Sequence, residues 1–299
     1  MKYRISHTTL YKYSQPTGLC QNEARLQPRN FWRQHCQFSR CEISPTPVDY
    51  REREDFFGNR VAYFAIQQSH LQLNVTAISE VVILSRQISL DLFNQEPWEQ
   101  VRDSLKETPL KSRQQWHELI DARQYRLDSP MVESGSELAE YAKPSFLPDR
   151  PLIEAIRDLT QRIYTDFTYD PSFTTVATPL SEVLMHKRGV CQDFAHLAIG
   201  CLRSYGLAAR YISGYVETLP APGQARLVGA DASHAWFAVY LPGSGWLEFD
   251  PTNNKLPYDQ HITLAWGRDY TDVTPLKGIA HGGGEHKLSV SVDVQRLDA

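Results

Sequence analysis

The hydrophobic period of this 299-residue chain first changes near Glu96, from that of strands to that of helices, and that change restricts the folds open to it. From Tyr3 to Tyr13 apolar and polar residues alternate, which is the period of a strand with one buried face. After Glu96 apolar residues recur every three or four positions, as in an amphipathic helix. The pattern therefore predicts an α+β protein in which strands come first and helices follow.

The N-terminal part continues as β structure. Alternation returns at residues 61–65 and 71–75, and the apolar run from Val81 to Leu84 is typical of a strand buried on both faces. Turn-forming residues separate these segments. We predict an antiparallel β domain of the sandwich type over residues 1–92.

Two further regions are predicted after this domain. Pro109, Pro130 and Gly135 break residues 93–145 into short helical pieces, which we interpret as a connector packed against one or both domains. Residues 146–299 are predicted to form the C-terminal core. The expected elements of this core are helices over 152–165, 180–187 and 191–205, strands over 208–217, 233–241 and 245–250, and a C-terminal strand over 287–296.

Composition excludes several functions. The net charge of −4 favours neither nucleic acid nor an anionic membrane as a partner. No apolar run approaches the roughly 18 residues of a membrane helix, and the N-terminus lacks the apolar stretch of a secretory signal, so a cytoplasmic location is expected. The five cysteines are odd in number and include no Cys-x-x-Cys pair, which predicts free thiols and gives no support to a structural zinc site.

Cys191 is the best candidate for a nucleophile. It follows Gly189 at the opening turn of the predicted 191–205 helix, which Gly206 is placed to cap. A thiol attacks as a thiolate, and the unpaired N–H groups at a helix N-terminus favour that negative charge. The same amides could hold the oxyanion of a tetrahedral intermediate.

His234 and Asp250 complete a predicted catalytic triad. His234 begins one predicted strand, and Asp250 ends the next, just before Pro251. A turn at residues 242–245 joins the two strands into a hairpin, which would bring the carboxylate beside the imidazole. This is the orienting role that the third member of a triad plays for its histidine.

The sequence around these residues resembles a known family. Three segments look like the signature blocks of bacterial transglutaminase-like proteins: GVCQDFAH, SHAW and DPTNN, which contain Cys191, His234 and Asp250. The N-terminal segment YRISHTTLYKYSQP and the segment GRDYTDVTPLKG are similar to flanking regions of one branch of that family. The resemblance implies a papain-like α+β core that acts on amide bonds through a thioester acyl-enzyme, with no metal and no organic cofactor.

The sequence does not assign the second donor of the oxyanion hole. Papain-type enzymes carry a glutamine six residues before the nucleophile, where this chain has Met185. Gln192, Tyr169 and Trp236 are the alternative candidates for oxyanion or substrate contacts. Asp193 is expected to complement the helix dipole rather than to act in catalysis.

We therefore predict a cysteine-dependent amide-bond hydrolase or acyltransferase, a peptidase or amidase acting on a peptide or protein. With an amine as acceptor, the same site would make a protein-glutamine transglutaminase. A thioester-dependent acyltransferase is a further alternative, although no glycine-rich phosphate loop suggests a coenzyme A site. The rival from another class is a non-catalytic peptide-binding protein on the same fold. The sequence gives no indication of oligomeric state.

Overall fold

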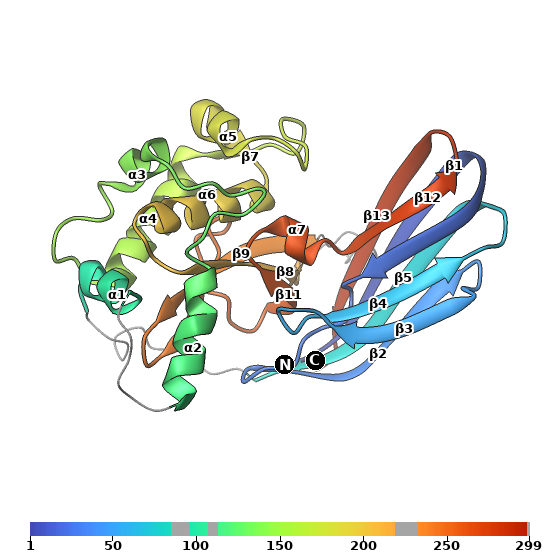
Figure 1. Ribbon diagram of the computed structural model, residues 1–299, viewed down its shortest axis with the longest axis horizontal. Helices are drawn as coiled ribbons and strands as arrows, with labels where there is room; N and C mark the ends of the chain where they lie inside the picture. The colour runs from blue at the N-terminus through green and yellow to red at the C-terminus, as the bar shows by residue number, and fades with distance from the viewer. Residues whose placement is uncertain (85–95, 107–112, 219–232, 298–299) are drawn as a thin grey trace, which may run out of the picture.

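The computed structural model describes residues 1–84, 96–106, 113–218 and 233–297. A strand-rich part, formed by both ends of the chain, lies beside a part in which helices pack on a smaller sheet (Figure 1). Within the described ranges, no helix combines the length and the apolar character needed to cross a membrane. The α+β class predicted from the change in period is confirmed.

The N-terminal sheet is built around one long strand, β1 (Lys2–Ala24). The first half of β1 pairs with β5 and β13, and its second half pairs with β4 and β12. All pairings in this sheet are antiparallel. Its other strands are β2 (Gln34–Ser44), β3 (Asp49–Glu54), β4 (Arg60–Ile66), β5 (His70–Ile83), β12 (Leu276–Gly282) and β13 (His286–Arg296).

The two halves of this sheet pack face to face. Strands β4 and β5 contribute to one apolar cluster although they pair with different halves of β1. The predicted sandwich therefore arises from a single seven-stranded sheet that folds over along β1, not from two separate sheets. The buried members of the cluster are Cys20, Ala24, Leu26, Ala62, Phe64, Ile66, Leu73, Val75, Ala77 and Leu276.

The C-terminal strand lies in a different domain from the one predicted. Strand β13 forms where alternation indicated a strand, but it pairs with β1 from Tyr3↔Arg296 to Tyr13↔His286 and so belongs to the N-terminal sheet. The assignment of residues 287–296 to the catalytic core was wrong. Alternation identifies a strand and its buried face, but it carries no information about the partner strand.

The core contains a four-stranded antiparallel sheet and seven helices within the described residues. The sheet order is β10-β9-β8-β11. Its strands are β8 (Ala209–Val216), β9 (Ser233–Leu241), β10 (Gly245–Phe249) and β11 (His261–Gly267). The helices are α1 (Trp98–Ser104), α2 (Arg113–Gln124), α3 (Ser136–Ala142), α4 (Leu152–Asp166), α5 (Leu180–His186), α6 (Cys191–Ser204) and α7 (Tyr270–Val273).

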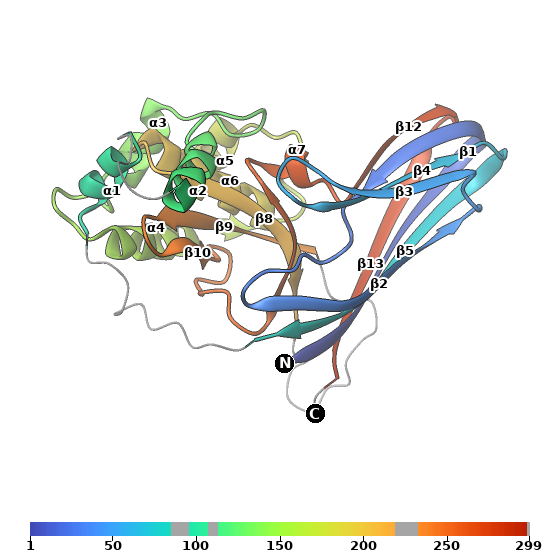
Figure 2. The ribbon, with the colours of Figure 1, turned by 60° about the horizontal axis from the view of Figure 1, so that its bottom comes forward.

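Helix α6 is the centre of the core. It packs on β8 and β9 and is covered by α3, α4 and α5, as Figure 2 shows from a second direction. Gly206 follows it with a φ of +73°, the left-handed conformation expected of a C-terminal glycine cap. Leu138 and Ala142 of α3 belong to the same apolar cluster, so this part of the predicted connector is integral to the core.

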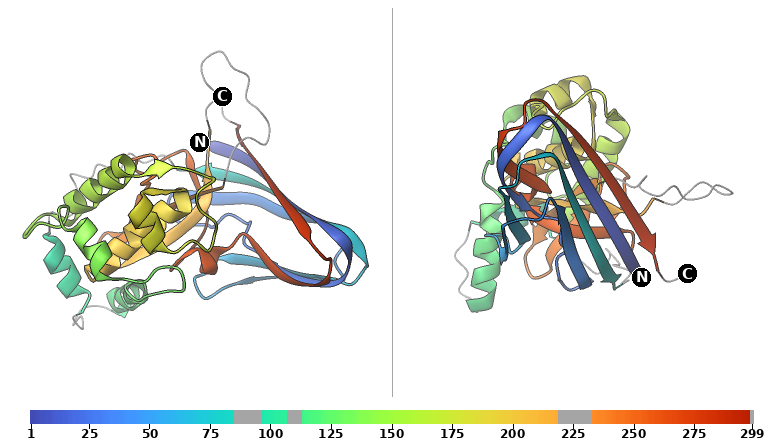
Figure 3. Two further views of the ribbon diagram at one scale, coloured as in Figure 1. Left: turned by 90° about the horizontal axis from the view of Figure 1, so that it is seen from above. Right: turned by 90° about the vertical axis from the view of Figure 1, so that its right-hand side faces the viewer.

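Buried polar contacts fix the N-terminal sheet against the core. The Glu217 carboxylate accepts hydrogen bonds from the Tyr3 hydroxyl (3.0 Å) and from Arg296 (2.6 Å). His7 Nδ1 lies 2.8 Å from the Tyr215 hydroxyl. From these contacts the sheet extends away from the core, as the view from above shows (Figure 3, left). The N-terminal sheet and the core are therefore joined through these buried contacts.

Candidate active site

Cys191 is the first residue of α6, and the turn before it is held by the next acid in the helix. Asp193 Oδ2 accepts hydrogen bonds from the Val190 N–H and from the Thr174 hydroxyl, both at 2.8 Å. A Cβ on Gly189 would lie 2.8 Å from that same carboxylate oxygen, which explains the glycine. The expectation that Asp193 serves the helix start is confirmed. Cys191 keeps a partly exposed side chain at the helix N-terminus.

The predicted hairpin brings His234 and Asp250 together. Strands β9 and β10 pair antiparallel up to Phe249↔Phe237, and Asp250 follows directly. His234 Nε2 lies 2.8 Å from Asp250 Oδ2 and donates its hydrogen to it, because a carboxylate only accepts. Nδ1 is therefore the ring nitrogen left for Cys191.

Asp250 is fully buried and accepts five hydrogen bonds. Oδ1 accepts from the backbone N–H groups of Thr252 (3.0 Å) and Asn253 (3.2 Å). Oδ2 accepts from the Asn253 side chain (2.7 Å), from His234, and from His261 Nε2 at 2.9 Å. Burial alone would raise the pKa of Asp250, but the hydrogen bonds from the two histidines hold it well below its usual range. The carboxylate is ionised whenever the protein is folded near neutral pH.

The charge of Asp250 acts on His234 together with Cys191. Burial lowers the pKa of His234, but hydrogen bonds to Asp250 and to the Cys191 sulfur, with the negative charges of both, raise it to about 10. An imidazolium is therefore the favoured state of His234 at neutral pH. A cysteine attacks as a thiolate, and a cation beside its sulfur favours that form.

Cys191 and His234 open into a cavity of about 340 Å³ whose two walls come from different parts of the chain. The core wall includes Tyr169, Tyr211 and Tyr270. The facing wall comes from β1 and β13 of the N-terminal sheet: His7, Thr9, Tyr11, Leu288 and Val290. The N-terminal sheet thus supplies part of the active-site cavity itself.

Comparison with known proteins agrees with this geometry. Residues 3–82 match the bacterial transglutaminase-like N-terminal region, and residues 140–251 match the transglutaminase-like superfamily. The chain belongs to the transglutaminase-like superfamily.

The relatives of this chain differ in how much of it they cover. An uncharacterized protein of Mycobacterium tuberculosis is 42% identical over 98% of this chain and 92% of its own length. A protein-glutamine gamma-glutamyltransferase of Pseudomonas aeruginosa is 31% identical, but over only 39% of this chain and 19% of its own length. The crystal structure of a Cytophaga hutchinsonii protein, described as a candidate cysteine protease, covers 100% of this chain and 91% of its own with a TM-score of 0.76 at 21% identity. That likeness concerns the fold alone.

The structure separates the three further residues predicted for this transglutaminase-like site. Tyr169 and Gln192 both line the cavity, and the Gln192 amide also donates to the Val176 carbonyl at 3.4 Å. Trp236 lies in the core instead: it is fully buried, and its indole N–H donates to Glu248 at 2.8 Å. Its ring stacks on His234, so the shared strand face was predicted correctly, but the N–H is not directed at the cavity.

Two residues that matter to the site were not predicted. His261, at the start of β11, binds the triad carboxylate, and no motif in the sequence marks it. Tyr211 is almost completely buried, yet it lines the cavity and interacts electrostatically with Cys191. The sequence predicted that Tyr211 lies on a strand, but it did not predict which of the two faces of the sheet the side chain occupies.

The ligand atoms of His234, His261 and Asp250 lie within 4.8 Å of one another, which is close enough for a metal site. Both Nε2 atoms lie at hydrogen-bond distance from the same oxygen, Oδ2. Each nitrogen must then carry a hydrogen, whereas a metal ligand must present a lone pair. The arrangement fits a hydrogen-bond network around the triad carboxylate.

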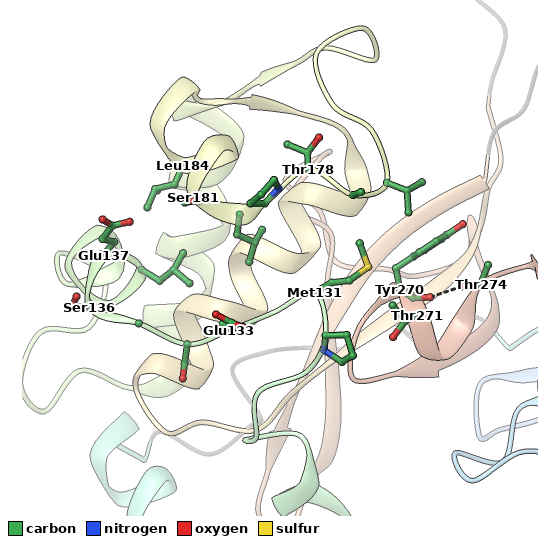
Figure 4. Close-up of a pocket in the computed structure, with 18 residues that line it drawn as sticks. Met131, Glu133, Ser136, Glu137, Thr178, Ser181, Leu184, Tyr270, Thr271 and Thr274 are labelled. Atoms are coloured by element: carbon green, nitrogen blue, oxygen red, sulfur yellow. Dashed lines mark hydrogen bonds between the residues drawn. The ribbon is translucent and has the colours of Figure 1, made fainter.

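A larger groove of about 950 Å³ adjoins the catalytic cavity (Figure 4). Tyr270 borders both spaces, and the Gln192–Val176 hydrogen bond joins a residue of one wall to a residue of the other. Apolar side chains such as Met131 and Leu184 line the groove. Its charged lining residues, within the described part of the chain, are the acids Glu133 and Glu137.

Proposed function

We propose that this protein is a cysteine-dependent amide-bond hydrolase that acts through a thioester on Cys191. The observation that carries the proposal is the arrangement around His234. One ring nitrogen is bound to a buried carboxylate at 2.8 Å, and the imidazole also interacts with a cysteine at a helix N-terminus. Asp250 fixes the tautomer of His234 and stabilises its cationic form.

The reaction divides into two acyl transfers. The Cys191 thiolate attacks the amide carbonyl carbon, and the C–N bond breaks as His234 gives its proton to the leaving nitrogen. A thioester and a free amine result. Water then attacks the thioester while His234 takes its proton, which releases the carboxylic acid and restores the thiolate–imidazolium pair.

The oxyanion formed in each step needs two donors. The backbone N–H of Cys191 lies in the first turn of α6, where helix amides lack intrahelical acceptors. For the second donor we favour the Tyr211 hydroxyl over Tyr169. Tyr211 is 2% exposed, while Tyr169 is 52% exposed, and a dry, fixed donor stabilises an oxyanion more strongly. Within the described residues the Tyr211 hydroxyl makes no hydrogen bond of its own.

We propose a peptide or protein as the substrate. The cavity at Cys191 and the groove share Tyr270 as a lining residue, and side by side they offer more lining than a single side chain requires. A small amide would leave most of this lining in contact with water, whereas an extended peptide would cover it.

Selective alkylation tests the activation of Cys191. We expect iodoacetamide at pH 6 to label Cys191 at least about 100-fold faster than Cys36, because a thiolate reacts and a thiol does not. Cys36 is a matched control, since it is also partly exposed and burial raises its pKa. Equal rates would refute the activated pair and favour the non-catalytic binding protein. Loss of amide hydrolysis in Cys191→Ala, with peptide and glutamine-amide substrates, tests the activity itself.

A second candidate is transfer of the acyl group to an amine. The observation that favours it is the groove, which carries two carboxylates and, among its described lining residues, no basic side chain. A relative in Pseudomonas aeruginosa is named as a protein-glutamine gamma-glutamyltransferase. Adding a primary amine to a hydrolysis assay distinguishes the two: a transferase forms the amide product at the expense of the acid, and a hydrolase does not.

A further inference from the structure

His261 has features that a packing residue does not need. It is 3% exposed, and its Nε2–H donates to Asp250 Oδ2, the same oxygen that His234 uses. Its ring lies edge-on against Trp236, with centroids 5.1 Å apart. Its other nitrogen, Nδ1, is buried and has no hydrogen-bond partner among the described residues. A phenylalanine would fill this space without burying an unpaired nitrogen.

The surroundings of His261 keep it neutral. Burial lowers its pKa, and the nearby charges of His234 and Arg33 act in the same direction against the attraction of Asp250. Arg33 donates to the His261 carbonyl at 3.2 Å and pairs with Glu248 on its other side. A neutral imidazole that donates through Nε2 has its single tautomer fixed, so it remains a hydrogen-bond donor through the range in which enzymes work.

We propose that His261 is a positioning residue of the catalytic centre, which holds the Asp250 carboxylate in place and draws part of its charge away from His234. The inference rests on the proposed function, because it assigns a purpose to the same triad. A carboxylate oxygen that serves two donors is a weaker base toward each. His234 therefore releases its proton to a leaving group more readily than it would beside an unshared carboxylate.

The pKa of His234 depends on the charged groups that face it, so these groups decide how it should be measured. Cys191 faces it from α6, Asp250 from the end of β10, and His261 from β11, with Arg33 and Glu248 behind His261. Blocking Cys191 with iodoacetamide removes the variable thiolate charge. The titration of His234 in the blocked protein then reports the carboxylate and its donors, and ¹⁵N-histidine NMR reads both the pKa and the tautomer.

Two substitutions separate positioning from packing. His261→Phe keeps an aromatic ring but removes the donor, and we expect the pKa of His234 in the blocked protein to rise by about one unit. His261→Gln places an amide N–H near the position of Nε2, and we expect it to restore the pKa to within about 0.3 units of wild type. In unblocked protein, His261→Phe should lower kcat for amide cleavage about tenfold or more with little change in KM, and His261→Gln should not.

Specific outcomes would overturn the proposal. They are an unchanged pKa of His234 in a folded His261→Phe, an equal shift in His261→Gln, or a His261 in wild type that is cationic or carries its hydrogen on Nδ1 at pH 7. Stoichiometric metal in the purified protein would do the same. If His261→Phe does not fold, the wild-type tautomer and His261→Gln decide. The NMR result needs no substrate, so a protein that cleaves no amide but shows these shifts would refute the proposed function alone.

Discussion

Replacing Asp250 with asparagine removes the charge on which the site depends while keeping its size. The Oδ2 atom of Asp250 accepts three hydrogen bonds, from His234, His261 and Asn253. In Asp250→Asn the side-chain amide places at this position either its oxygen, a weaker acceptor than a carboxylate, or its NH₂ group, whose hydrogens would face those three donors. We therefore expect Asp250→Asn to lose about 1–3 kcal/mol of stability in addition to its effect on the imidazole.

The magnitude of the second effect follows from the pKa of His234. Its rise from 6.5 to about 10 corresponds to about 5 kcal/mol of preference for the imidazolium, to which Asp250 and Cys191 both contribute. If the carboxylate supplies half of it, the pKa of His234 falls by about 2 units in Asp250→Asn, and Cys191 alone is left to oppose the effect of burial. We expect a fall in turnover of about 10³–10⁴, the loss typical when a triad histidine is no longer held in its tautomer.

The assay is the rate of Cys191 alkylation from pH 4 to pH 9, with the product located by mass spectrometry. Asn253→Ser is the matched control: it removes an uncharged donor to the same Oδ2 atom and should change the rate by less than about threefold. A folded Asp250→Asn whose alkylation profile coincides with wild type would refute the reasoning, since the carboxylate would then have no effect on the thiolate–imidazolium pair.

The same change has a signature in stability against pH. A raised pKa of His234 stabilises the folded protein below about pH 6.5, and this contribution is lost as the pH rises through about 10. The depressed pKa of Asp250 contributes stability above about pH 3.9, which is lost as the pH falls toward its folded value. Between pH 6.5 and pH 9.5 the free energy of unfolding should therefore fall less in Asp250→Asn than in wild type, as measured by urea unfolding at the two pH values.

Three further predictions concern neighbouring residues. Gly189→Ala should slow Cys191 alkylation about tenfold, because its Cβ would lie 2.8 Å from the Asp193 carboxylate oxygen that holds the turn; a rate equal to wild type would contradict this. Tyr211→Phe should lower kcat for amide cleavage about 10²-fold with KM nearly unchanged, and Tyr169→Phe much less; the reverse order would assign the oxyanion donor to Tyr169. Burial lowers the pKa of His7 to about 4, so protonation of His7 favours the unfolded state. Between pH 4 and pH 6.5 the free energy of unfolding should therefore rise by up to about 3 kcal/mol more in wild type than in His7→Gln, as measured by urea unfolding.

The sequence predicted the parts of the site that depend on local structure. A helix start places Cys191, and a hairpin pairs His234 with Asp250, so short segments with clear turn signals were sufficient. The roles of these residues in catalysis stay predictions until they are measured. His261 differs because it reaches Asp250 from β11, which pairs with β8 on the far side of the sheet from β10. Strand order, which alternation does not encode, determines that contact.

The second wall of the cavity depends on the same kind of information. Leu288 and Val290 are about half exposed, and the sequence shows only a one-sided strand there. Both side chains line the cavity opposite Cys191 because β13 pairs with β1. No motif near the triad could indicate that the end of the chain lines the active site.

The position of this wall is set by contacts that lie outside the cavity. Glu217 on the core side binds Tyr3 and Arg296, one from each strand that forms the wall. The carboxylate is buried, so losing it would leave two donors unsatisfied in the interface. Because Glu217 directly follows β8, the strand that carries Tyr211, the contact joins the wall to the core strand beneath the proposed oxyanion site. The shape of the substrate cavity is therefore linked to the packing of the two domains, while the triad itself is held within the core.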